Sequence, residues 1–259
     1  MILDVLARLC SSIAEDLKLE IVDFAIGIRY SYTVVRGPNG YAIGLCYVDY
    51  LDVVGAPLPC EPSFDRLEDM ARSLNPLERI LATALVNAVG QYLLWNEQKT
   101  RARIEKTNIV ELLPKIIEKS RRVAVVGYMK PIVRALIDSG YSVVVLERSP
   151  FLRASSSAIL DTYLSRVIKD VDVVLVTGSA ITNDTLDTIV ELAKAHGIRI
   201  VLVGPSAGAL PDHLFELGID IVASIRITDV ARATRAIRLG ASRPDLEPYA
   251  QSYVAFPPS

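Results

Sequence analysis

Apolar residues in the second half of the chain fall into five short runs, and helical patterns separate them. Runs of this length and composition are typical of strands buried on both faces of a parallel sheet. They predict strands over residues 122–127, 142–147, 172–177, 199–203 and 219–223 and helices near residues 131–139, 157–168, 184–196, 209–217 and 228–239. Alternating strands and helices form right-handed βαβ units. We therefore expect a Rossmann-like parallel sheet, followed by an extended or frayed tail over residues 241–259.

The first half shows a different pattern. It predicts a helix over residues 1–18 and then strands over residues 20–29, 31–35 and 41–48. The turn residues at 37–40 (GPNG) separate the last two strands and favour a hairpin. These elements indicate a small antiparallel sheet packed by the first helix.

Two further helices complete the pattern. Asn75 is a good helix cap and Pro76 suits a first helical position, so a long helix should run from there to about residue 97. A helix over residues 107–119, kinked by Pro114, should lead into the second half. We expect an α/β protein with an α+β domain over residues 1–105 and a Rossmann-like domain over residues 106–259.

Composition narrows the class of function. The 259 residues are 51% hydrophobic and 22% charged, with a net charge of −2. This balance gives no indication of nucleic-acid or anionic-membrane binding. No apolar run reaches the roughly 20 residues that span a bilayer, and acids near the N-terminus do not suit a signal peptide. We expect a soluble, cytoplasmic protein whose high apolar content lies in buried strands or in a homodimer interface.

Potential soft-metal ligands are few. Cys10, Cys46 and Cys60 are far apart, and the histidines are His196 and His213. The spacing predicts neither a disulfide framework nor a zinc ribbon. A bound metal would therefore need oxygen ligands from Asp and Glu.

The first two strands of the second half end at Gly127 and Glu147. In dinucleotide-binding folds, an acid at this point accepts hydrogen bonds from ribose hydroxyls. However, Gly127 is followed by Tyr128 and then, after two residues, by Pro131, which obstruct a pyrophosphate. This pattern favours a nucleoside-like or pterin-like ligand over NAD. Alternatively, Gly127 is only a tight turn and Glu147 pairs with a surface cation.

The next two strands end in small polar residues. The third is followed by Thr177, Gly178, Ser179, Asn183, Asp184 and Thr185, and the fourth by Gly204, Pro205 and Ser206. Hydroxyls and free backbone N–H groups at strand ends suit an anion or a carbonyl group. Capping of the next helix by Asn183 or Asp184 is the alternative.

The long helix contributes Glu78 and Asn87. A buried Asn on an apolar helix needs hydrogen-bond partners, so Asn87 either meets a ligand or ties the helix to a loop. Gly27 and Gly44, in the strand segments of the first half, would admit a close backbone approach.

Seven segments in order resemble the family named "putative heavy-metal chelation". They are GIRY, GLCY, NPLER, VVGY, LERSP, TGSAITNDT and GPS, and the resemblance spans about residues 1–240. It implies an enolase-N-terminal-like α+β domain fused to a Rossmann-like domain, with a site between them. It also implies a role in handling metals or making metal-chelating molecules. Asn183-Asp184 stands where the family pattern has Asn-Gly.

The expected function is the binding or transformation of a small heteroaromatic or nucleoside-like molecule in the interdomain cleft, linked to heavy-metal chelation. Glu78 and Glu147 are the acid–base candidates, since interface burial would raise a carboxyl pKa toward neutrality. The ligand-binding candidates are Asn87, Gly127, Tyr128, Thr177, Gly178, Ser179, Asn183, Thr185, Gly204, Pro205 and Ser206. A non-catalytic protein that binds a metal or a metal complex and an S-adenosylmethionine-dependent methyltransferase are the alternatives. The cofactor and the metal stay open.

Overall fold

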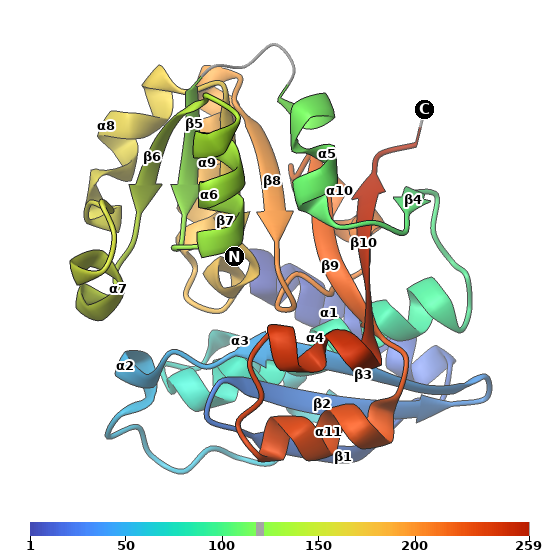
Figure 1. The fold of residues 1–259 in the computed structure, drawn as a ribbon. Helices are drawn as coiled ribbons and strands as arrows, with labels where there is room; N and C mark the ends of the chain where they lie inside the picture. Colours follow the sequence, from blue (N-terminus) through green and yellow to red (C-terminus); the bar gives the residue numbers. More distant parts are fainter. Residues whose placement is uncertain (118–121, 259) are drawn as a thin grey trace.

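The computed structural model describes residues 1–117 and 122–258, and these form two sheets in a mixed α/β arrangement (Figure 1). The smaller sheet is antiparallel, with β1 (Glu20–Ile26), β2 (Tyr30–Gly37) and β3 (Gly40–Tyr47) in chain order. The larger sheet has the order β4-β10-β9-β8-β7-β5-β6. Its strands are β4 (Arg103–Glu105), β5 (Arg122–Val126), β6 (Ser142–Leu146), β7 (Val173–Thr177), β8 (Arg199–Val203), β9 (Ile221–Ile227) and β10 (Ala250–Phe256). The expected fold class is confirmed.

The α-helices begin and end close to the expected residues in most cases. They are α1 (Ile2–Asp16), α2 (Tyr50–Val53), α3 (Leu67–Arg72), α4 (Pro76–Trp95), α5 (Ile109–Ile116), α6 (Lys130–Asp138), α7 (Pro150–Ala154), α8 (Leu164–Val167), α9 (Thr185–His196), α10 (Pro211–Glu216) and α11 (Val230–Arg238). The side chain of Asn75 accepts from the Leu77 N–H at 3.0 Å, which confirms the cap of α4. Pro114 lies inside α5, and residues 118–119 of the helix expected there fall outside the described residues.

The five strands β6, β5, β7, β8 and β9 run parallel. Their side chains alternate between two cores, as the strand period of two requires. Val123, Val125 and Leu175 face α5 and α6, whereas Ala124 and Val174 belong to the core that includes α9. The strands are therefore covered on both faces, which explains their unbroken apolar runs.

The carboxyl ends of these parallel strands point toward the antiparallel sheet (Figure 1). That sheet lies between two helices. Gly44 of β3 lets α4 approach so closely that a Cβ atom there would lie 2.6 Å from the carbonyl carbon of Asn87. On the other face, Tyr32 and Val34 share a core with Ile237 of α11. The second half of the chain thus contributes a helix to the first half's sheet.

Helix α4 is the centre of the molecule. All residues from Arg79 to Leu94 are buried, although a helix at a surface would bury one face only. It packs against the antiparallel sheet, against α1 and α3, and against the loop that follows β8. This full burial explains the small residues and the sparse charges along the helix.

Two expectations from the sequence were wrong. The tail does not fray: residues 250–256 form β10, which lies inside the larger sheet and pairs antiparallel with β9 and β4. The helix expected over residues 157–168 is reduced to the single turn of α8 flanked by 3-10 turns, while α7 precedes it. Neighbouring strands stabilise β10 through pairing, which a local pattern does not reveal.

Among residues 1–117 and 122–258, no helix combines the length and the apolar character that crossing a bilayer demands.

Candidate functional site

The strand order places a topological switch point between β5 and β7. Strand β6 lies on one side of β5, and the chain then continues on the other side through β7, β8 and β9. Open α/β sheets bind ligands at such a point, outside the carboxyl ends of the strands. Gly127 and Thr177 meet there: a Cβ atom on Gly127 would lie 2.6 Å from the methyl group of Thr177. Gly127 also has φ +86°, a conformation that suits glycine.

Glu147 joins the two loops beside the switch point. Its carboxylate accepts from the Tyr128 N–H at 2.7 Å and from the Ser149 N–H at 2.8 Å, and its side chain is buried. The expected pairing of Glu147 with a surface cation is not what the structure shows; Arg148 instead pairs with Asp52 at 3.2 Å. Glu147 holds the loops after β5 and β6 in place, and its remaining lone pairs are the ones that a ligand hydroxyl could use.

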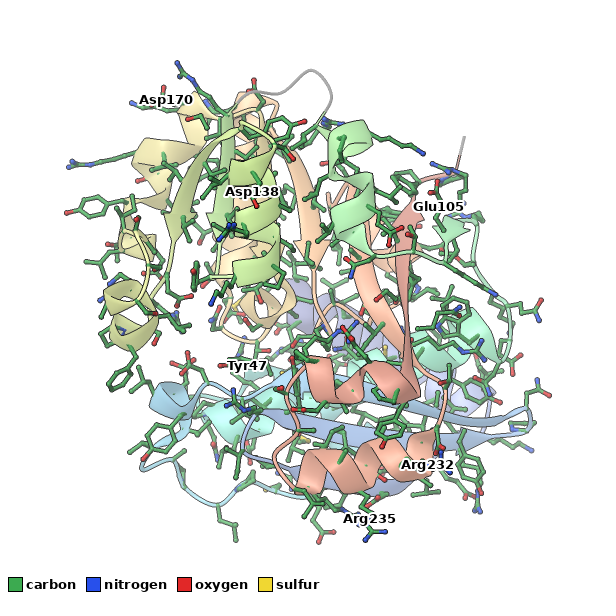
Figure 2. All side chains as sticks on the ribbon, in the orientation of Figure 1. Tyr47, Glu105, Asp138, Asp170, Arg232 and Arg235 are labelled. Atoms are coloured by element: carbon green, nitrogen blue, oxygen red, sulfur yellow. The ribbon has the colours of Figure 1, made fainter. Side chains whose placement is uncertain are left out.

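The first half of the chain brings Tyr47 to the same place. Figure 2 shows Tyr47 at the junction between the two sheets. Its N–H donates to the Ser206 hydroxyl at 2.8 Å, while the residue is 38% exposed. Its ring meets Tyr30 edge-on, with centroids 5.9 Å apart. Partial burial raises the pKa of Tyr47, with further contributions from Asp49, Arg29 and Glu147.

The loop after β7 is fastened to α4. The Arg79 guanidinium donates to the Thr182 carbonyl at 2.6 Å and pairs with the Asp184 carboxylate. The Asn183 side chain accepts from the Thr185 N–H at 3.2 Å, as the capping alternative anticipated. Asp184 itself has φ +59°, which explains why glycine fits this position in the family pattern.

The loop after β8 is fastened in the same way. Asn87 donates to the carbonyls of Leu45, at 2.8 Å, and Ser206, at 2.9 Å. The Ser206 hydroxyl is occupied by Tyr47, and Gly204 forms the turn with φ +114°. A Cβ atom on Gly178 would lie 2.6 Å from the carbonyl carbon of Ser206, so the two loops touch. In this structure, the polar groups of Asn87 and Ser206 tie the two halves together.

Glu78 lies apart from this junction in its contacts. Its carboxylate accepts from the Cys60 N–H at 3.2 Å. A hydrogen bond from Ser73 is the main cause that lowers the pKa of Glu78, against a smaller opposing effect of burial. The expectation that burial would raise this pKa was therefore wrong, because the hydrogen bonds outweigh the desolvation.

The donor set for a metal ion was tested next. Within residues 1–117 and 122–258, the structure brings together no group of three His, Cys, Asp or Glu side chains that could hold one. The described residues of a single chain therefore do not fit a resident metal ion.

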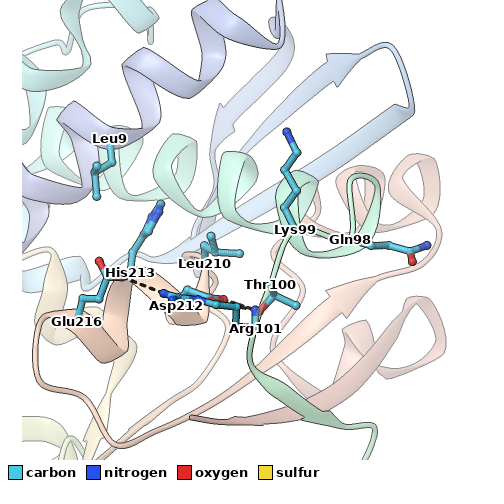
Figure 3. A pocket seen from close by; sticks show the side chains of 9 residues that line it. All are labelled: Leu9, Gln98, Lys99, Thr100, Arg101, Leu210, Asp212, His213 and Glu216. Atoms are coloured by element: carbon cyan, nitrogen blue, oxygen red, sulfur yellow. Dashed lines mark hydrogen bonds and ion pairs between the residues drawn. The ribbon is translucent and has the colours of Figure 1, made fainter. Parts of the chain in front are cut away.

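A separate groove of about 470 Å³ lies between the two halves on another side (Figure 3). It is lined by Leu9 of α1, by residues 98–101 after α4, and by Leu210, Asp212, His213 and Glu216 at α10. None of the expected site residues lines it.

Sequence reasoning missed three residues that define the junction: Tyr47, Arg79 and Thr182. Their side chains or backbones link the β3–α4 unit to the loops after β7 and β8. The only signal was their membership of GLCY, NPLER and TGSAITNDT, where attention fell on the glycines and on Asn183.

Comparison with known proteins supports this architecture. Two family models described as "putative heavy-metal chelation" match residues 9–90 and 108–256. The chain belongs to this family. An uncharacterized protein of Methanocaldococcus jannaschii is 30% identical over 240 residues, which cover 91% of this chain and 88% of that protein.

Two crystal structures of family members have the same fold. A protein of unknown function from Pyrococcus horikoshii gives a TM-score of 0.86 at 30% identity and covers 98% of this chain and 99% of its own. Another of unknown function, from Desulfitobacterium hafniense DCB-2, gives 0.69 at 21% identity, over 96% and 97% of the two chains. The second likeness concerns the fold alone.

Proposed function

We propose that this protein binds a small heteroaromatic or nucleoside-like molecule at the switch point between β5 and β7, in connection with metal chelation. The observation that carries the proposal is the meeting of Gly127 and Thr177 at the carboxyl ends of two parallel strands with crossovers to opposite sides. Such points bind ligands because loops diverge there and leave backbone groups accessible.

Side chains of suitable chemistry surround the point. The hydroxyls of Thr177 and Ser179 lie 3.1 Å apart, and both residues are partly exposed. Tyr47 contributes an aromatic ring from the other half of the chain, and Glu147 contributes a carboxylate. An aromatic face, hydroxyls and one acid recognise a planar heterocycle with polar edges. Of the two acid–base candidates, Glu147 lies at this point, whereas Glu78 contacts Cys60.

Identification of any co-purifying molecule tests the proposal. Wild-type protein is denatured, and the released small molecules are identified by mass spectrometry; a thermal-shift panel of nucleosides and pterins follows. The double variant Thr177→Val with Ser179→Ala should lose the response, while Thr188→Val, at an exposed position of α9, should keep it. The proposal fails if nothing is released and no panel member stabilises the protein, or if the double variant responds like the wild type.

The family description favours a second candidate, a non-catalytic protein that binds a metal or a metal complex. Elemental analysis of purified protein and calorimetric titrations with free and chelated metal separate it from the first. Binding of the free metal would favour this candidate, and binding of only the chelate would favour a planar ligand at the switch point. Adenosine cofactors in the thermal-shift panel test the methyltransferase alternative, and light scattering tests the predicted homodimer.

A further inference from the structure

The groove between α1 and α10 brings together unused hydrogen-bond donors and an apolar floor (Figure 3). Its volume of about 470 Å³ lies within the range of small-molecule sites. Both halves of the chain form it, since Leu9 comes from α1 and His213 from α10. It shares no residue with the switch point and does not depend on the function proposed above.

The acids of the groove are already engaged. Asp212 accepts from the Arg101 N–H at 2.8 Å and from the Thr100 hydroxyl. Arg101 lies 3.5 Å from Asp212 and 3.2 Å from Glu216. These contacts lower the pKa of Asp212 even though burial alone would raise it. A cationic ligand would therefore have to compete with Arg101 for these acids.

The donors, by contrast, are available. Among residues 1–117 and 122–258, the side chains of Gln98, Lys99 and His213 have no hydrogen-bond or ion-pair partner. Burial lowers the pKa of His213, with smaller opposing effects from Glu216 and Asp212. At neutral pH, the ring is therefore an uncharged donor beside an ammonium group.

The floor is apolar. Leu9 is 37% exposed, and Val5, one helical turn earlier on α1, is 38% exposed. Leu210 lies on the opposite side of the groove. Exposed aliphatic side chains next to an unpaired ammonium match a ligand with an apolar body and an anionic end.

We propose that this groove binds a small amphiphilic carboxylate, with its carboxylate at Lys99 and its apolar part on Leu9 and Leu210. The Gln98 amide and the His213 ring would supply further donors to the carboxylate oxygens. No covalent step is involved.

The two histidines allow a site-specific test in the full-length protein. Octanoate is titrated while the ring C–H resonances of His213 and His196 are followed by NMR. Octanoate should shift His213 and raise its pKa, because a nearby negative charge favours the imidazolium, and His196 should not respond. Octylamine, with the opposite charge on the same chain, should leave both unchanged.

Matched variants locate the two ends of the ligand. Lys99→Gln should weaken octanoate binding about two- to fivefold, the range of an exposed ion pair, and Leu9→Gln should also weaken it. Lys169→Gln, at another exposed lysine, should bind like the wild type. The proposal is overturned if millimolar octanoate leaves His213 unshifted, if octylamine acts equally, or if Lys99→Gln and Lys169→Gln behave alike.

Discussion

Two pairs of loops occupy the same edge of the parallel sheet and have opposite fates. The loops after β7 and β8, residues 178–185 and 204–210, are held by α4 and β3 through Arg79, Asn87 and Tyr47. The loops after β5 and β6, residues 127–130 and 147–149, are held only by Glu147 and remain partly exposed. We call these the fastened loops and the open loops.

The comparison shows that small polar residues at a strand end do not identify a ligand site by themselves. Both pairs of loops carry glycines, hydroxyls and free backbone groups, because both turn sharply at a sheet edge. What distinguishes them is whether another part of the chain consumes those groups. Here the first half of the chain covers the fastened loops and leaves the switch point beside the open ones.

The largest effect should come from the contact that lets α4 reach the antiparallel sheet. Gly44→Ala would force a Cβ atom into the backbone of α4 and should lower the free energy of unfolding by about 3 kcal/mol or more. Gly208→Ala, which meets only the Asn87 side chain at 3.2 Å, should cost about 1 kcal/mol. Urea unfolding measures both. Equal costs would show that α4 and the sheet can separate freely.

Arg79→Met should reveal how strongly the loop after β7 is fastened. It leaves the carbonyls of Thr182 and Ala71 without their donor and Asp184 without its partner, which should cost about 3 kcal/mol. Hydrogen exchange should rise in residues 178–185 and stay unchanged in residues 127–130. Uniform exchange across both loops would contradict the distinction between them.

Thr177→Val should affect ligand response more than stability. It removes one hydroxyl pair at the switch point and should change the free energy of unfolding by no more than about 1 kcal/mol. A stability loss as large as that of Arg79→Met would place Thr177 among the fastening residues instead.

The smallest effect concerns Glu78 and pH. Because its folded pKa is lowered, it stabilises the protein above its model value of 4.5, and that contribution is lost as pH falls through the folded pKa. Glu78→Gln should therefore lower the free energy of unfolding at neutral pH by less than about 1 kcal/mol, since the carboxylate is mostly exposed. The difference between Glu78→Gln and wild type should vanish in acid, as urea midpoints across pH would show. A difference that persists in acid would point to packing.

Much of the fold was predictable from local pattern. The apolar runs that became β5, β7 and β8 and the Asn75-Pro76 start of α4 were placed within a few residues. The candidate site was predictable as an edge, through Gly127, Glu147 and Thr177, but not as a set of contacts. Asn87 and Ser206 appeared as ligand residues because their hydrogen-bond partners lie 42 and 119 positions from Asn87 and 159 positions apart for Ser206 and Tyr47.

The amino-acid sequence alone determined the strands, the helices and their caps, because steric preferences and apolar periodicity act over a few residues. Only the tertiary structure decided that α4 is buried on every side, that residues 250–256 insert as β10 between β9 and β4, and which loops stay open. The physical reason is that hydrogen-bonding groups at a strand end are satisfied by whatever segment packs against them, and that segment comes from the distant half of the chain.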